Sequence, residues 1–112
     1  MRPPSPEALE AAVRRVMDAL VTWGAKKVIL YGSVARGDYT ASSDIDLIVV
    51  KETTERSPQR IAEALGLCFD TRPPLPVEPL VYTPEEFAGM VRDENPLLTE
   101  ALRHGRVLHD QA

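Results

Sequence analysis

The segment from Gly32 to Asp46 holds the residues whose types and spacing could do chemistry. Gly32 and Ser33 directly follow an apolar stretch that ends in Tyr31. Glycine lets the backbone approach a ligand closely, because it has no side chain to clash. If a short helix begins at Ser33, its free amides favour bound phosphate, and the Ser33 hydroxyl and the Arg36 guanidinium can both donate to phosphate oxygens. Taken alone, the same residues are equally compatible with an ordinary turn and a surface charge.

Asp44 and Asp46 stand at the start of a strongly apolar stretch. Side chains two residues apart on a strand point to the same face, about 6.6 Å apart along it. Two such carboxylates repel each other unless a cation neutralises them. Mg²⁺ usually binds through a few carboxylates together with substrate phosphates, and two such ions ~3.5–4 Å apart need a bridging carboxylate. A lone pair of this kind is more often a helix cap or a solvated loop, but beside Gly32 and Ser33 it favours a site for metal and phosphate.

A third acid would complete such a site, and Glu78 is the candidate that lies in an expected strand. It shares a strand face with Leu80 and Tyr82, so this face carries an acid followed by apolar side chains. The alternative is that Glu78 merely points to solvent from an edge strand. Pro79 favours an edge position or a bulge for this strand, because proline withdraws one hydrogen-bond donor from the sheet.

The elements that must position these residues are helices and strands in the order helix, strand, short helix, strand, helix, strand, helix, helix, with a short last strand. Ser5-Pro6-Glu7 predicts the start of the first helix, and Gly24 its end, since a capping hydroxyl and an early proline begin helices and glycine ends them. Gly66 is expected to end the third helix in the same way. We predict strands at 27–31, 44–50, 77–82 and 106–109, and helices at 5–24, within 32–43, at 57–66, from 83 and at 95–103.

Other side chains are expected in structural roles. The third helix should bury Ile61, Ala64 and Leu65. Tyr39 could touch a nucleotide or be an exposed loop residue. Cys68 is expected to be a small buried hydrophobe, His104 and His109 surface residues, and the core or interface anchors Trp23, Phe69 and Phe87.

Composition limits the location and the partners. A chain of 112 residues with 44% apolar and 27% charged residues fits one soluble globular domain. The net charge of −4 argues against general nucleic-acid binding, which requires a basic surface. Cys68 is the single cysteine, so no internal disulfide can form and the cytoplasm is the expected compartment. No apolar run approaches the ~20 residues that a membrane helix needs, and the first residues lack the apolar core of a signal peptide.

Two linked stretches of the sequence, Gly32-Ser33-Val34-Ala35-Arg36-Gly37 and Ser43-Asp44-Ile45-Asp46-Leu47, resemble the signature of the DNA polymerase β-type nucleotidyltransferase superfamily. The closest likeness is to its minimal stand-alone branch, the minimal nucleotidyltransferases. The resemblance implies an α/β fold of the α+β type, in which helices pack against one mixed sheet, and a single minimal domain over residues 1–112.

The resemblance also implies an activity, namely in-line transfer of a nucleoside monophosphate with release of pyrophosphate. In the family pattern Gly32 and Ser33 hold the triphosphate of ATP or another nucleoside triphosphate, and Asp44 and Asp46 bind two Mg²⁺ ions. The third acid, here Glu78, binds metal and activates the acceptor hydroxyl. The family commonly has aspartate at this third position, so the longer glutamate can shift the geometry between metal and acceptor.

Similar minimal proteins act with a separate helical HEPN protein in toxin–antitoxin pairs, in which the nucleotidyltransferase is the antitoxin. Some of them modify a tyrosine of the HEPN protein, so the resemblance implies transfer of AMP to a partner tyrosine. A second interpretation stays open, in which a catalytically weak nucleotide-binding module neutralises its partner by occlusion alone. Intact Asp44 and Asp46 favour the enzyme, whereas Glu78 and the short segment after it, with no room for the lid domain of larger relatives, favour occlusion.

Overall fold

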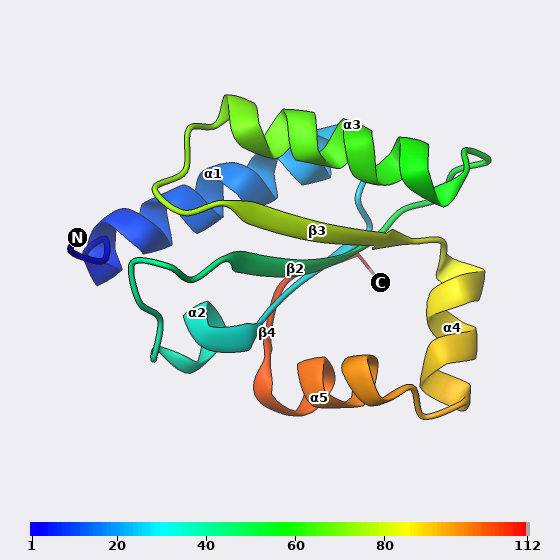
Figure 1. Cartoon of the computed structure of the whole chain (residues 1–112). Helices are drawn as coiled ribbons and strands as arrows, with labels where there is room; N and C mark the ends of the chain where they lie inside the picture. Colours follow the sequence, from blue (N-terminus) through cyan, green and yellow to red (C-terminus); the bar gives the residue numbers. More distant parts are fainter. Residues whose placement is uncertain (112) are drawn as a thin grey trace.

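The computed structural model describes residues 1–111 and contains a four-stranded sheet with helices on both faces (Figure 1). In Figure 1, α1 and α3 lie on one side of the sheet, α2 and α5 lie on the other, and α4 stands beyond one end of β3. None of the helices among residues 1–111 is long and apolar enough to cross a membrane. The elements in chain order are α1 (Pro6–Trp23), β1 (Lys27–Tyr31), α2 (Gly32–Arg36), β2 (Ile45–Val50), α3 (Ser57–Asp70), β3 (Val77–Tyr82), α4 (Pro84–Arg92), α5 (Pro96–His104) and β4 (Arg106–Asp110).

The sheet is mixed, as expected. Its strand order is β3-β2-β1-β4, with β1 antiparallel to both of its neighbours and β2 parallel to β3. β3 is an edge strand, which confirms the position that Pro79 indicates. Because β2 and β3 are parallel, their starting ends meet at the same end of the sheet. This pairing brings the segment before β2 close to the start of β3.

Two core clusters cover the two faces of the sheet. Successive residues of a strand point to opposite faces of the sheet, so they contribute to different clusters. The larger cluster joins the sheet to α1 and α3 and includes Leu9, Val13, Val16, Leu20, Val28, Leu30, Ile45, Leu47, Val49, Ala64, Cys68 and Val81. The smaller cluster joins the sheet to α4 and α5 and consists of Ile29, Ile48, Leu98 and Ala101, against which Tyr31, Tyr82, Phe87 and Met90 pack.

The third helix, α3, ends later than expected, because it runs through Gly66 to Asp70. An interior glycine costs a helix only about 1 kcal/mol, and burial of Ala64 and Cys68 on this helix outweighs that cost. The helix ends where Arg72 adopts a positive φ of 53°. Leu65 is 44% exposed, so the expectation that this helix buries it was wrong.

Three further side-chain expectations have different outcomes. Cys68 is buried, as expected. Phe69 is 79% exposed, so it is no core residue. His109 is half-buried on β4, and its Nε2 atom is buried without a hydrogen-bond partner among residues 1–111, so the surface position expected for it was wrong.

Arg60 is a buried charged residue that the sequence does not single out. Its Nε donates to the carbonyl of Glu55 at 2.7 Å, and its Nη1 donates to Glu86 Oε1 at 2.7 Å and to the carbonyl of Val81 at 3.3 Å. Val81 lies on the edge strand, so Arg60 occupies a carbonyl that another strand could otherwise use. One side chain therefore ties α3, the loop before it, β3 and α4 together.

Arg60→Met should lower the free energy of unfolding by about 1–3 kcal/mol, because it leaves a buried carbonyl and a carboxylate without their donor. Urea unfolding measures this change. Arg14→Met is the matched control, since Arg14 is exposed on α1 and forms no ion pair among residues 1–111. An equal effect of the two substitutions would contradict the role of Arg60.

The same contact has a pH dependence. The Arg60 guanidinium, followed by the backbone amide of Thr83, holds the pKa of Glu86 below its usual value of 4.5. A lowered carboxyl pKa stabilises the fold above the usual value, and this contribution is lost as the pH falls through the lowered pKa. The difference in stability between wild type and Arg60→Met should therefore shrink as the pH falls below about 4.5.

Candidate active site

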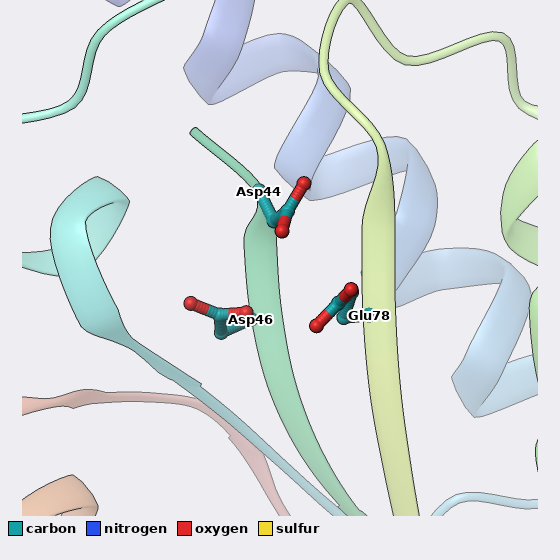
Figure 2. A group of neighbouring side chains, drawn as sticks. All are labelled: Asp44, Asp46 and Glu78. Atoms are coloured by element: carbon teal, nitrogen blue, oxygen red, sulfur yellow. The ribbon is translucent and has the colours of Figure 1, made fainter. Parts of the chain in front are cut away.

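Three carboxylates meet at the end of the sheet where β2 and β3 begin. Asp44 directly precedes β2, Asp46 lies on β2, and the register pairs Asp46 with Glu78 on β3. One oxygen from each carboxylate lies within 4.8 Å of the other two. Figure 2 shows the three side chains on one side of the two neighbouring strands. The structure thus brings together the three acids that the sequence singles out.

The electrostatics of this cluster penalise its charged state. The pKa of Asp46 is raised, chiefly by burial and then by the negative charges of Glu78 and Asp44, while Arg36 opposes the shift. Asp44 and Asp46 are half-buried, and Glu78 is exposed. A set of oxygen donors that repel one another suits a hard divalent cation such as Mg²⁺, which removes the repulsion and prefers oxygen ligands. The residues present therefore fit the metal that the motif implies.

The Gly32–Ser33 turn lies against the carboxylate of Asp46. β1 ends at Tyr31 and α2 begins at Gly32, whose φ is +77°. A Cβ atom at position 32 would overlap Asp46 Oδ2, so a larger residue there would displace this carboxylate or the turn. Ser33 is half-buried, and among residues 1–111 its hydroxyl forms no hydrogen bond to the protein, which leaves it available to a ligand.

Arg36 and Tyr39, the two other residues considered as nucleotide contacts, lie farther along the chain and make contacts within the protein. Arg36 is exposed at the opposite end of α2 from Gly32, and its Nε donates to Asp38 Oδ2 at 3.3 Å. Its effect on the pKa of Asp46 shows that its charge acts on the site, while its contact with phosphate stays a prediction. Tyr39 is half-buried, and its hydroxyl donates to the carbonyl of Pro4 at 3.0 Å, so this side chain fixes the N-terminal segment.

Tyr31 is a neighbour of the site that sequence reasoning treated only as the end of a strand. It is paired with Asp46 in the register of β1 and β2. Burial, then the charge of Asp46, then Tyr82 and Glu78 raise the pKa of Tyr31 to about 12. The available signal was its place directly before Gly32, on the strand face that Ile29 shares.

Comparison with known proteins agrees with this geometry. The sequence profile of the family described as "Nucleotidyltransferase domain" matches residues 13–101. The chain belongs to this family. The matched segment contains the Gly32–Ser33 turn and all three acids. A protein of Methanocaldococcus jannaschii named "Putative protein adenylyltransferase" is 48% identical over 44 residues, a match that covers 37% of this chain and 44% of that protein. The chain thus matches less than half the length of this curated relative.

In this nucleotidyltransferase domain, Ser33→Ala should weaken the binding of a nucleoside triphosphate. A hydrogen bond to a charged group contributes about 1.5–3 kcal/mol, which corresponds to a loss of affinity of roughly 10- to 150-fold. Calorimetry with ATP and Mg²⁺ measures this loss of affinity. Ser42→Ala is the control, because Ser42 is exposed in the loop before β2. Equal affinities of the Ser33 and Ser42 variants would show that Ser33 is no phosphate ligand.

Proposed function

We propose that this domain transfers AMP from ATP to a hydroxyl acceptor on a protein and releases pyrophosphate. The convergence of Asp44, Asp46 and Glu78 beside the Gly32–Ser33 turn is the observation that carries the proposal. Membership of the nucleotidyltransferase domain family supports the transfer of a nucleotidyl group. The name of the curated relative supports a protein as acceptor and AMP as the group that is transferred.

The transfer forms one bond and breaks one. The acceptor oxygen forms a bond to the α-phosphorus of ATP, and the bond from that phosphorus to the oxygen bridging to the β-phosphate breaks. Glu78 is exposed beside Asp46 and accepts the proton of the acceptor hydroxyl. Gly32 and Ser33 hold the leaving pyrophosphate through backbone amides and the serine hydroxyl. Two Mg²⁺ ions held by Asp44, Asp46 and Glu78 would neutralise charge that develops on the phosphate oxygens.

The proposed acceptor is a tyrosine of a helical HEPN-type partner, with the nucleotidyltransferase as the antitoxin of the pair. The support is the resemblance of the motif to minimal nucleotidyltransferases, together with the exposed position of Glu78, which a protein acceptor can reach. Positioning contributes much of the rate in such transfers, so we expect slow turnover until the partner supplies an oriented hydroxyl.

The test is co-incubation of the purified protein with its HEPN-type partner, labelled ATP and Mg²⁺, followed by mass spectrometry. An AMP adduct on a partner tyrosine, absent with Asp46→Asn and absent without Mg²⁺, is the expected result. Parallel reactions with GTP and CTP establish the base preference. A partner that is neutralised without an adduct, and equally well by Asp46→Asn, would establish occlusion in place of transfer.

A further inference from the structure

The face of the sheet that carries the acids can be described as a grid set by the strand register. One row holds Tyr31, Asp46 and Glu78 on β1, β2 and β3, and the next row holds Ile29, Ile48 and Leu80. A third row places Tyr82 opposite Val50. Each row thus runs from the turn side of the sheet, at β1, to the free edge, at β3.

Helices α4 and α5 cover this grid unevenly. Ile29 and Ile48 are fully buried beneath Leu98 and Ala101. On β3, by contrast, Leu80 is half-buried and is not among the side chains packed in that cluster, and Glu78 is exposed. The β3 side of the face therefore offers an open strip of Glu78 and Leu80, which borders on the half-buried Tyr82 at the margin of the smaller cluster.

The geometry of the transfer reaction indicates which substrate group approaches over this strip. The attacking and leaving oxygens lie roughly in line across the phosphorus. The pyrophosphate leaves toward Gly32 and Ser33, which follow β1, and Asp46 lies on the strand between β1 and β3. The acceptor must therefore approach from the β3 side, over the strip.

We propose that Leu80 and Tyr82 form the acceptor subsite and that it binds the phenol side chain of a tyrosine. This inference rests on the proposed transfer reaction. The acceptor hydroxyl lies at Glu78, and its ring lies over Leu80, because same-face side chains are about 6.6 Å apart along a strand and a phenol side chain has a similar length. The half-buried Tyr82 forms no side-chain hydrogen bond within residues 1–111, so its hydroxyl is available to donate to the acceptor. A serine or threonine acceptor would leave the half-buried Leu80 uncovered.

Binding can be tested apart from catalysis. N-acetyl-tyrosinamide is titrated into the full chain in the presence of Mg²⁺ and a non-hydrolysable ATP analogue, and the methyl groups of leucine are followed by NMR. The expected result is a shift of the Leu80 signals, with N-acetyl-serinamide causing none. No shift up to the solubility limit would overturn the subsite. A shift at Leu65 or Leu75 in place of Leu80 would also overturn the subsite. It would show that the amide binds in the groove of about 1260 Å³ at the end of α3, which Leu65 and Leu75 line.

Kinetics with the protein acceptor supply the second measurement. Leu80→Ser should raise the KM for the acceptor about tenfold, because part of an apolar contact is lost, and should leave the KM for ATP unchanged. Leu80→Met should keep the KM for the acceptor near the wild-type value, because methionine retains the apolar contact. Leu102→Ser, which changes an exposed leucine of α5, should have no effect on this KM. An unchanged acceptor KM in Leu80→Ser would overturn the subsite. If the amide binds at Leu80 but no AMP is transferred to any acceptor, the proposed function fails and the subsite stands.

Discussion

Asp46→Asn should lower the rate of AMP transfer by at least about 100-fold and, at the same time, stabilise the protein in the absence of metal. Loss of one group that stabilises developing charge typically costs a factor of 10²–10³ in rate. Asp46 lies at the centre of the acidic cluster and contacts the Gly32 turn, so its removal affects both metal and nucleotide. Labelled-ATP transfer assays and calorimetry with Mg²⁺ and ATP measure the two effects.

The stabilisation follows from the raised pKa of Asp46. Below its usual value of 3.8 the carboxyl is protonated in the folded and the unfolded protein, so it contributes nothing. Between that value and the raised pKa the unfolded protein releases its proton while the folded protein keeps it, so the wild type loses stability over this range of pH. Asparagine does not titrate. In thermal unfolding with EDTA, the variant should therefore melt at a higher temperature than the wild type at pH 7, and the two melting temperatures should converge near pH 4. Asp18→Asn, an exposed position on α1, should show neither effect. A variant at position 46 that keeps metal-dependent ATP binding and turnover would refute the metal-site assignment.

Gly32→Ala should weaken ATP binding and lower the rate of AMP transfer about 100-fold, as a displacement of the order of 1 Å at a reacting group can. The added Cβ would overlap Asp46 Oδ2, so the turn and the carboxylate must move apart. A branched residue, as in Gly32→Val, should be worse. In Gly32→Ala the positive φ of +77° also strains the backbone of the folded protein, which lowers the free energy of unfolding by about 1–3 kcal/mol.

Gly37→Ala is a closely matched control for this substitution. Gly37 has a φ of +83°, so alanine there is strained in the same way, but a Cβ would meet no atom within 4 Å. Both variants should be destabilised, and only Gly32→Ala should lose ATP binding. Loss of binding in both variants would trace the effect to backbone strain, and normal binding by Gly32→Ala would remove the turn from the site.

The sequence predicts the parts of the site that depend on local spacing. Asp44 and Asp46 share one strand end, and Gly32 follows another, so periodicity and turn chemistry locate them. Glu78 could be selected because it is the acid that leads an apolar strand face, although its pairing with Asp46 depends on the strand order.

Features that arise from tertiary contacts could not be predicted from the sequence. Arg60 resembles any helix arginine until β3 and α4 bring Val81 and Glu86 to it. The end of α3 was misplaced because packing of Cys68 outweighs the local preference of Gly66. The uncovered position of Leu80 depends on where α4 and α5 pack, which no local pattern encodes.

The position of Pro79 on the edge strand has a consequence for how reliably the site assembles. Ile45 donates to the carbonyl of Pro76 and Lys51 donates to the carbonyl of Tyr82, so even-numbered residues of β3 direct their backbone groups to β2. Odd-numbered residues, Pro79 among them, direct theirs outward, where a missing N–H removes nothing from the sheet.

A slip of β3 by one residue would reverse this arrangement. It would turn Glu78 to the α3 side of the sheet and place the ring of Pro79 where β2 requires a donor. The proline therefore acts as a register lock, since the misaligned pairing that would remove the third carboxylate from the cluster is also the pairing that loses a hydrogen bond.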